Sequence, residues 1–416
     1  MTEALRTTPD PGATRRVVAS FCFFALLLGA YYVIRPVRDA LVAGIGSGSI
    51  KYLSTGVLFI SAGVAAVYAA VVTVVPRRWF VPGLYGVFAL MLAGFSALFG
   101  RFPDSRLLAE AFYLWVAVFN LWMVATFWSF MADLWTTEAA ERQFGRIAAG
   151  GSVGGILGPW LVHQWAASLG PAGLTLAAAG LLGIAALVAH ALMPGGHARG
   201  YLRFDAPVGG SVWSGLRSLA VSPTLRAIAV LVAGGSILGM ILYIEVAKSA
   251  SQLYPDVALR TAFFAQRDLW VNAAACAIQF CLASHLMRRI GAPRVLTVVA
   301  MVTVGAFAAW GLSANVTTLL AVNIVLRTVE FGLAKPSRDA LYAGLDGDAK
   351  YKAKNVIDTV FYRACDSSAG WLHALLTAAG AGWPALGGLG VLAGLGLLRS
   401  TRQLPTSAGH RGRKRA

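Results

Sequence analysis

The sequence predicts an all-α polytopic membrane protein with twelve transmembrane helices in two sets of six. The first observation is composition: 57% of the 416 residues are hydrophobic, only 13% are charged, and the mean hydropathy is +0.67. A soluble domain has about 25% charged residues. The second is a series of apolar segments, each long enough to cross a hydrocarbon layer of about 30 Å. The third is one long polar interval near the middle of the chain.

Twelve apolar segments, bounded by Pro, Gly and charged residues, account for the predicted spans. They cover residues 17–43, 50–75, 80–99, 107–135, from 147, from 171 to before 194, 226–250, 262–287, 295–312, 317–343, 356–378 and 383–398. The predicted organisation is an N-terminal six-helix half (1–194), a cytoplasmic central loop (195–223), a C-terminal six-helix half (224–400) and a basic cytoplasmic tail (401–416).

The net charge of +17 is distributed asymmetrically. Most basic residues outside the spans fall in loops on the side of the N-terminus. The positive-inside rule then predicts a multi-pass protein of the inner (plasma) membrane with both termini in the cytoplasm, and argues against a nucleic-acid partner. Six plus six helices with a basic middle loop is the layout of a major-facilitator-type transporter, built from inverted three-helix repeats.

No motif of an enzyme, metal site or cofactor site occurs in the sequence. The glycine-rich stretch Gly150–Gly158 lacks the Lys-Ser/Thr of a phosphate loop. Its glycines recur every four residues, which predicts a close-packing helix face. The six histidines lack metal-ligand spacing, and no nucleophile elbow is present. We therefore expect no catalytic residues, no metal and no cofactor.

A seven-residue stretch occurs twice, as RPVRDAL at Arg35–Leu41 and as KPSRDAL at Lys335–Leu341. Each copy lies in an apolar segment, where a single Arg at mid-helix costs about 2.5–3.5 kcal/mol on insertion scales. Such residues usually face a watery cavity or one another and mark a substrate path. The alternative is an interhelical ion-pair lock without ligand contact. The candidate substrate-binding residues are Arg35, Arg38, Lys335, Arg338 and the neighbouring Tyr32, whose ring either stacks on a base or serves packing.

The inverted orientation of the repeats places the two copies at opposite depths. Each copy begins about 18 residues after its helix enters the membrane, or roughly 27 Å along the helix. The predicted outer cluster contains Arg35, Arg38, Asp39, Glu245 and Lys248, and the predicted inner cluster contains Asp133, Lys335, Arg338 and Asp339. Our hypothesis is that the two clusters are gates whose ion pairs form alternately across the two halves.

Two further features are open to more than one interpretation. Pro36 and Pro336 each remove a helical hydrogen bond, which frees the carbonyls of Tyr32 and Gly332 for a ligand or simply produces a packing kink. Asp358 and Arg363, in the eleventh predicted helix, serve either as gating partners or as a structural pair.

The sequence resembles the ATP/ADP antiporter family of plastids and intracellular bacteria, which is major-facilitator-like. Four patches carry the resemblance: the RPVRD segment of the first copy, FMADLWTT at 130–137 with the following ERQFG and glycine face, IEVAK at 244–248, and a long patch from Glu330 through the second copy to Asp358 and Arg363. The resemblance implies exchange of nucleotides, or of a related phosphorylated anion. It also implies Arg38 and Arg338 (or Lys335) as phosphate ligands, with Asp133 and Glu245 as their partners.

Two other functions remain open at this point. A proton-coupled major-facilitator permease for another solute would use Glu245, Asp358 or Asp366 as its titrating group. A membrane scaffold would use the charges only structurally. The expected partners are a small anionic substrate and the lipid bilayer, and a monomer is expected from the fold alone.

Overall fold

The computed structural model describes residues 11–74, 77–135, 137–193, 222–343, 354 and 356–404. Within these ranges every regular element is a helix, and eight helices are long and apolar enough to cross a membrane. The all-α polytopic class is therefore confirmed, and the arrangement is compatible with twelve spans. The predicted central loop up to residue 221 and the basic tail from residue 405 lie outside the described residues.

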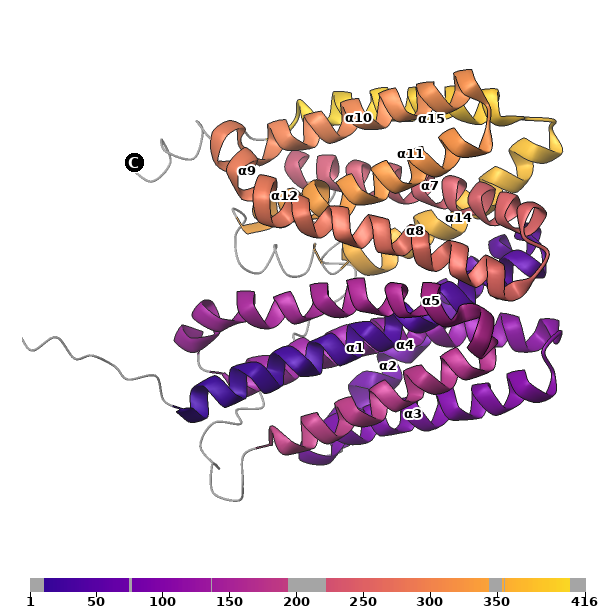
Figure 1. Cartoon of the computed structure of the whole chain (residues 1–416). Coiled ribbons are helices and arrows are strands. Elements are labelled where there is room, and N and C mark those ends of the chain that lie inside the picture. The colour runs from indigo at the N-terminus through magenta and orange to yellow at the C-terminus, as the bar shows by residue number, and fades with distance from the viewer. Residues whose placement is uncertain are drawn as a thin grey trace, which may run out of the picture. The chain divides into compact units, whose positions relative to one another are not determined.

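The helices follow the predicted apolar segments closely (Figure 1). Ser105, Ser222 and Asn315 cap three of them, since each side chain accepts a hydrogen bond from the backbone N–H three residues later. The first group is α1 (Pro11–Gly44), η1 (Ser47–Ser49), α2 (Ile50–Val74), α3 (Arg77–Arg101), α4 (Arg106–Leu134) and α5 (Thr137–Ala191). The second is α7 (Pro223–Leu253), α8 (Val257–Ile278), η2 (Gln279–Ala283), α9 (Ser284–Ile290), α10 (Ala292–Ser313), α11 (Val316–Val329), η3 (Glu330–Ala334), α12 (Lys335–Ala343), η4 (Val356–Phe361), α14 (Tyr362–Ala378) and α15 (Trp383–Thr401).

Helix α5 begins ten residues earlier than the sequence predicted, at Thr137 instead of near residue 147. The polar stretch EAAERQ consists largely of residues with high helix propensity, so it continues the helix. Its charged residues indicate that this part of the helix lies outside the apolar span. The helix is interrupted at Gly170, whose φ of 60° and ψ of −175° are not helical. Glycine adopts positive φ without a Cβ penalty, and Pro171 then starts the next helical segment where it was expected.

The chain divides into two compact units. Unit 1 comprises Met1–Leu41, Gly63–Ala206 and Asp256–Leu269, and unit 2 comprises Val42–Ala62, Pro207–Pro255 and Trp270–Ala416. This division differs from the predicted halves in two short segments. The beginning of α8 belongs to unit 1, and the segment from the end of α1 to the middle of α2 belongs to unit 2. Each unit therefore combines most of one six-helix set with one short piece of the other.

In unit 1, the glycine face of α5 packs against the backbone of α1. A Cβ on Gly150 would meet the carbonyl oxygen of Phe21, and a Cβ on Gly154 would meet that of Ala25. At Gly158 a Cβ would approach both the carbonyl oxygen of Gly29 and the Cβ of Tyr32. The predicted close-packing face is therefore confirmed. It fixes α1 against α5 as far as Tyr32, one turn before the first RPVRDAL copy.

In unit 2, a π-turn precedes the second copy of the motif. The Lys335 N–H reaches back five residues to the Glu330 carbonyl, as η3 requires. With this five-residue spacing, the backbone N–H that Pro336 lacks would have bonded to the carbonyl of Phe331. The carbonyl that loses its partner is therefore that of Phe331 and not, as expected, that of Gly332. The Gln279 side chain, from η2, donates to the Phe331 carbonyl at 2.9 Å. The freed carbonyl thus has a polar protein partner, and the expectation for Gly332 is corrected by one residue.

The glycine seam gives a direct test of how α1 is positioned. Replacing Gly154 by Leu should lower the midpoint of thermal denaturation in detergent, because overpacking costs about 1–3 kcal/mol and the obstacle here is backbone. Gly180→Leu is the matched control, since Gly180 lies in the segment of α5 after Gly170 and has open space around its Cβ position. Equal midpoints for the two variants would contradict the packing role of the seam.

Candidate functional site

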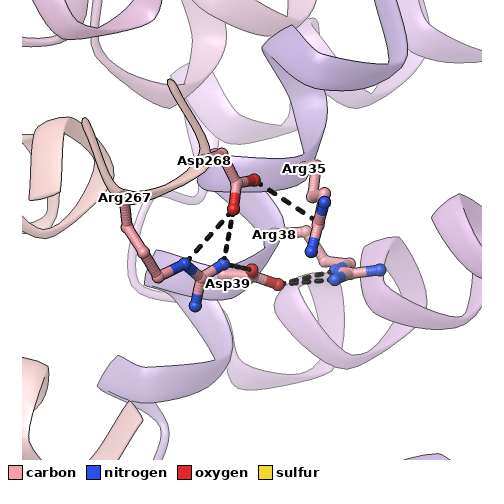
Figure 2. Close-up of polar contacts among 5 residues, drawn as sticks. All are labelled: Arg35, Arg38, Asp39, Arg267 and Asp268. Carbon is pink, nitrogen blue, oxygen red and sulfur yellow. Dashed lines mark hydrogen bonds and ion pairs between the residues drawn. The ribbon is translucent and has the colours of Figure 1, made fainter. Parts of the chain in front are cut away.

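The first copy of the motif forms the centre of a buried charge cluster in unit 1 (Figure 2). Asp39 on α1 is fully buried. Its Oδ1 accepts hydrogen bonds from Arg38 Nη2 at 2.6 Å and Nε at 2.9 Å. Its Oδ2 accepts a hydrogen bond from Arg267 Nη2, on α8, at 3.1 Å. Asp39 therefore joins two guanidinium groups from two different helices.

Helix α8 contributes an adjacent acid and base to this cluster. Arg267 also donates to Asp268 Oδ1, at 2.8 Å from Nη2 and 3.2 Å from Nε. Asp268 Oδ2 lies 3.4 Å from Arg35 Nε. Figure 2 shows the resulting order Arg38–Asp39–Arg267–Asp268–Arg35, in which the charges alternate. We call these five residues the α1–α8 charge cluster; none of their side chains is more than 14% exposed.

Aromatic rings support each guanidinium of the α1–α8 charge cluster. Arg35 lies 5.6 Å from the ring centre of Tyr32, and Arg38 lies 5.1 Å from that of Tyr113 on α4. Arg267 lies 4.9 Å from that of Phe264, one turn earlier on α8. These distances are within the range of cation–π attraction. The predicted candidate Tyr32 is thus an immediate neighbour of the predicted candidate Arg35.

The charges of the α1–α8 charge cluster do not balance within its five members. Three guanidinium groups face two carboxylates, and Arg267 Nη1 is buried without a hydrogen-bond acceptor among the described residues. A buried charge is costly unless it is paired and hydrogen-bonded. Asp268 Oδ2 is likewise buried without a hydrogen-bond donor among the described residues, although it lies 3.4 Å from Arg35 Nε.

The second copy of the motif lies in unit 2 in a more open environment. Lys335 is exposed. Arg338 donates to Glu330 at 2.6 Å and 3.3 Å, and the Glu330 side chain is 36% exposed. Asp339 pairs with Lys354 at 2.6 Å and is 44% exposed, whereas its counterpart Asp39 is fully buried. The two copies therefore differ in exposure at their first and last charged residues, whereas the side chains of Arg38 and Arg338 are similarly buried, at 14% and 13% exposed.

The other predicted residues have varied positions. Asp133 is half-buried near the end of α4, whereas Lys248 and Asp358 are exposed. Arg363 lies 4.0 Å from Asp366, within α14. Glu245 is buried in unit 2, where its two carboxylate oxygens contact His373 at 2.6 Å and Trp383 at 2.7 Å.

Sequence reasoning missed the α8 pair and both contacts of Glu245. Arg267 and Asp268 carried a usable signal, because an Arg-Asp dipeptide within an apolar segment also marks positions 38–39 and 338–339. His373 and Trp383 carried none, since they lie far from Glu245 in sequence and follow no motif spacing.

The fold has clear counterparts among solved structures, although no family model and no curated protein matches the sequence. A bacterial homologue of the human lysosomal transporter Spinster, in an inward-facing conformation, aligns with a TM-score of 0.59 and 12% identity over 95% of both chains. The nucleoside transporter NupG gives 0.63 and 12% over 93% of this chain and 98% of its own. The human organic anion transporter MFSD10 gives 0.55 and 16% over 94% and 100%. The chain therefore has the major-facilitator fold.

The burial of Asp39 predicts different effects of one substitution in the two motif copies. Asp39→Asn should lower the denaturation midpoint strongly, because removing one partner of a buried ion pair typically costs about 3–5 kcal/mol. Asp339→Asn, at the equivalent exposed position, should cost about 0–1 kcal/mol. Thermal denaturation of both purified variants checks this, and a larger loss for Asp339→Asn would contradict it.

Proposed function

We propose that this protein is a secondary transporter that exchanges nucleotides of the ATP/ADP type, or a related phosphorylated anion, by alternating access. The observation that carries the proposal is the contrast between the two motif copies. Arg35 and Asp39 are buried in ion pairs, whereas Lys335 and Asp339 are exposed. Because inverted repeats give equivalent elements opposite orientations, one closed copy and one accessible copy is the arrangement that alternation requires.

In the proposed cycle, the two copies exchange these environments. The α1–α8 charge cluster opens as its ion pairs separate, and the residues around Lys335, Arg338 and Asp339 become buried. Such a cycle needs two states of similar free energy, between which the substrate selects. The close similarity of the two seven-residue copies supports this, since each closed state can use the same kinds of ion pair.

The exposed second copy favours an anionic substrate. Lys335 lies in the candidate span Val316–Tyr342, and no ion pair joins it to another described residue. A lysine in a span faces a water-filled volume and not lipid, since lipid exposure of its charge is too costly. The neighbouring Arg338, which pairs with Glu330 in this state, has a guanidinium fork that also matches phosphate oxygens. In the proposal, a phosphorylated anion binds Lys335 and competes with Glu330 for Arg338.

Other features support the same substrate class. The resemblance to the ATP/ADP antiporter family involves both motif copies. Among the proteins of the same fold, one transports nucleosides and another organic anions. We place the protein in the inner membrane, with cytoplasmic termini and as a monomer; the second copy then faces the cytoplasm in the described state.

Exchange has a direct test in proteoliposomes. Labelled ATP should enter vesicles loaded with ADP and should not enter unloaded vesicles, because an exchanger needs substrate on both sides. Uptake into unloaded vesicles driven by a pH gradient would instead favour the second candidate, a proton-coupled permease. An absence of uptake in both preparations, with folded protein, would contradict nucleotide exchange, and other phosphorylated anions would then be screened.

A substitution in the second copy tests the anion site itself. Lys335→Gln should reduce exchange by about tenfold or more, because a hydrogen bond to a charged group is worth about 1.5–3 kcal/mol and about 1.4 kcal/mol corresponds to a factor of ten. The matched control is Arg106→Gln, which removes a cation whose pair with Glu110 is largely exposed. Unchanged exchange in Lys335→Gln would contradict this role of the lysine.

A further inference from the structure

A second buried polar site lies in unit 2, at Glu245. The side chain of Glu245, on α7, is 1% exposed. Its Oε1 lies 2.6 Å from His373 Nε2, on α14, and its Oε2 accepts a hydrogen bond from Trp383 Nε1, on α15, at 2.7 Å. We call these three residues the α7–α14–α15 triad. Both carboxylate oxygens are thus occupied by donors from two other helices.

Of the two donors that contact Glu245, only His373 can carry a charge. The Trp383 indole is neutral, and on its other side it packs against Trp310 of α10, at 6.2 Å between ring centres. The His373 imidazole can be either neutral or positively charged. A neutral imidazole leaves the buried triad with one negative charge, whereas a protonated one makes it neutral. The net charge of the buried triad therefore changes with a single proton on His373.

Two lysines lie near the triad, and neither forms an ion pair with Glu245. Lys248, three residues after Glu245 on α7, attracts the Glu245 carboxylate electrostatically, but its side chain is exposed. On the α2 side, Lys51 packs beside Gly370 of α14, but its ammonium group lies over the rings of Tyr52 and Trp371, at 4.9 Å and 5.0 Å.

The remaining acid near the triad on α14 is Asp366, about two turns before His373, and it accepts a hydrogen bond from Ser236 on α7. It therefore belongs to a separate contact. The closest ionisable partner of Glu245 is His373.

We propose that the α7–α14–α15 triad is a proton-binding site whose occupancy is coupled to transport. The proton comes from water and binds to Nδ1 of His373, while Nε2–H continues to donate to Glu245. No other bond is made or broken. Histidine suits this role because its charge ordinarily changes between pH 5 and 8.

The position of the triad connects the proton to a structural change. His373 lies one turn after Gly370, where α14 approaches the backbone of α2 at Lys51. The same seam contains the hydrogen bond between Thr55 and Ser367, at 2.8 Å, and that from Trp371 to Thr55, at 3.1 Å. Loss of the proton weakens the bond that holds α14 to α7, and α14 carries the contact with α2. In the proposal, proton release therefore acts on the same helix that forms the seam with α2.

The inference rests on the proposed function for its consequence in transport. Exchange of ATP for ADP moves one extra negative charge, because the two anions differ by one phosphate group. A proton that travels with the more highly charged anion makes the exchange electroneutral. The triad can supply that proton site from the chain's own residues.

The proton site can be measured without any transport. The sequence contains six histidines. A variant in which the five other than His373 are replaced by Gln retains His373 as its only imidazole; the five are His163, His190, His197, His285 and His410. Its ¹⁵N signals in lipid nanodiscs should change between pH 5 and 9, with a midpoint that moves to lower pH in Glu245→Gln. An imidazole that stays neutral over this range, or a midpoint unaffected by Glu245→Gln, would overturn the proposal.

Transport then tests the coupling, with His373→Gln compared against His285→Gln, which changes an exposed histidine of α9. Wild type and the control should exchange ATP for ADP without response to an imposed membrane potential, and a pH dye should report proton movement with ATP. The His373→Gln variant should still exchange, should move no proton, and should respond to the potential. Proton movement in His373→Gln equal to wild type would overturn the coupling.

Absence of exchange in wild type would instead refute the proposed function, and the NMR titration would then decide the proton site by itself.

Discussion

The arrangement of unit 1 depends on the neutralisation of charge buried between α1 and α8. Asp39 and Arg267 are almost completely removed from solvent, and each binds a residue of its own helix and a residue of the other. Arg260 adds a hydrogen bond from α8 to the Ala40 carbonyl of α1, at 3.2 Å. Well-packed apolar side chains often stabilise such a contact as well as a buried ion pair or better. Stability alone therefore does not explain the cluster. In the proposed cycle the contact forms and separates, and separated ion pairs can be hydrated whereas separated apolar faces cannot.

The two motif copies show that residues outside the motif, both upstream on the same helix and on a neighbouring helix, determine the environment of its charges. Aligning the copies places buried Ala30 opposite Glu330. In the second copy, Glu330 lies in the π-turn before Pro336 and binds Arg338 from its own helix. In the first copy no acid is available at that position, and Arg38 binds Asp39, which also takes Arg267 from α8. One substitution upstream of the motif thus distinguishes an intrahelical pair from an interhelical cluster.

Much of the fold could be predicted from hydropathy because a bilayer requires long apolar helices whatever their neighbours are. The glycine face of α5 was predictable for a similar reason, since a four-residue period places small residues on one side. The early start of α5 was missed because the helix was predicted to begin where the sequence becomes apolar. Polarity indicates where the membrane begins, whereas helix propensity indicates where the helix begins. The contacts of Glu245 were missed for a different reason. Hydrogen bonds to His373 and Trp383 depend on the packing of three helices, which residue patterns along one chain do not specify.

The two buried polar sites share an electrostatic property despite their opposite signs. The α1–α8 charge cluster contains one more guanidinium than carboxylates, whereas the α7–α14–α15 triad contains one carboxylate and two neutral donors when His373 is unprotonated. A buried charge without a partner is costly in a low-dielectric interior. In the proposed cycle, a bound anion reduces this cost at the first site and a bound proton reduces it at the second. A ligand shifts a conformational equilibrium only through a difference in free energy between states. Under the two proposals, the substrate and the proton would each favour the state that holds it.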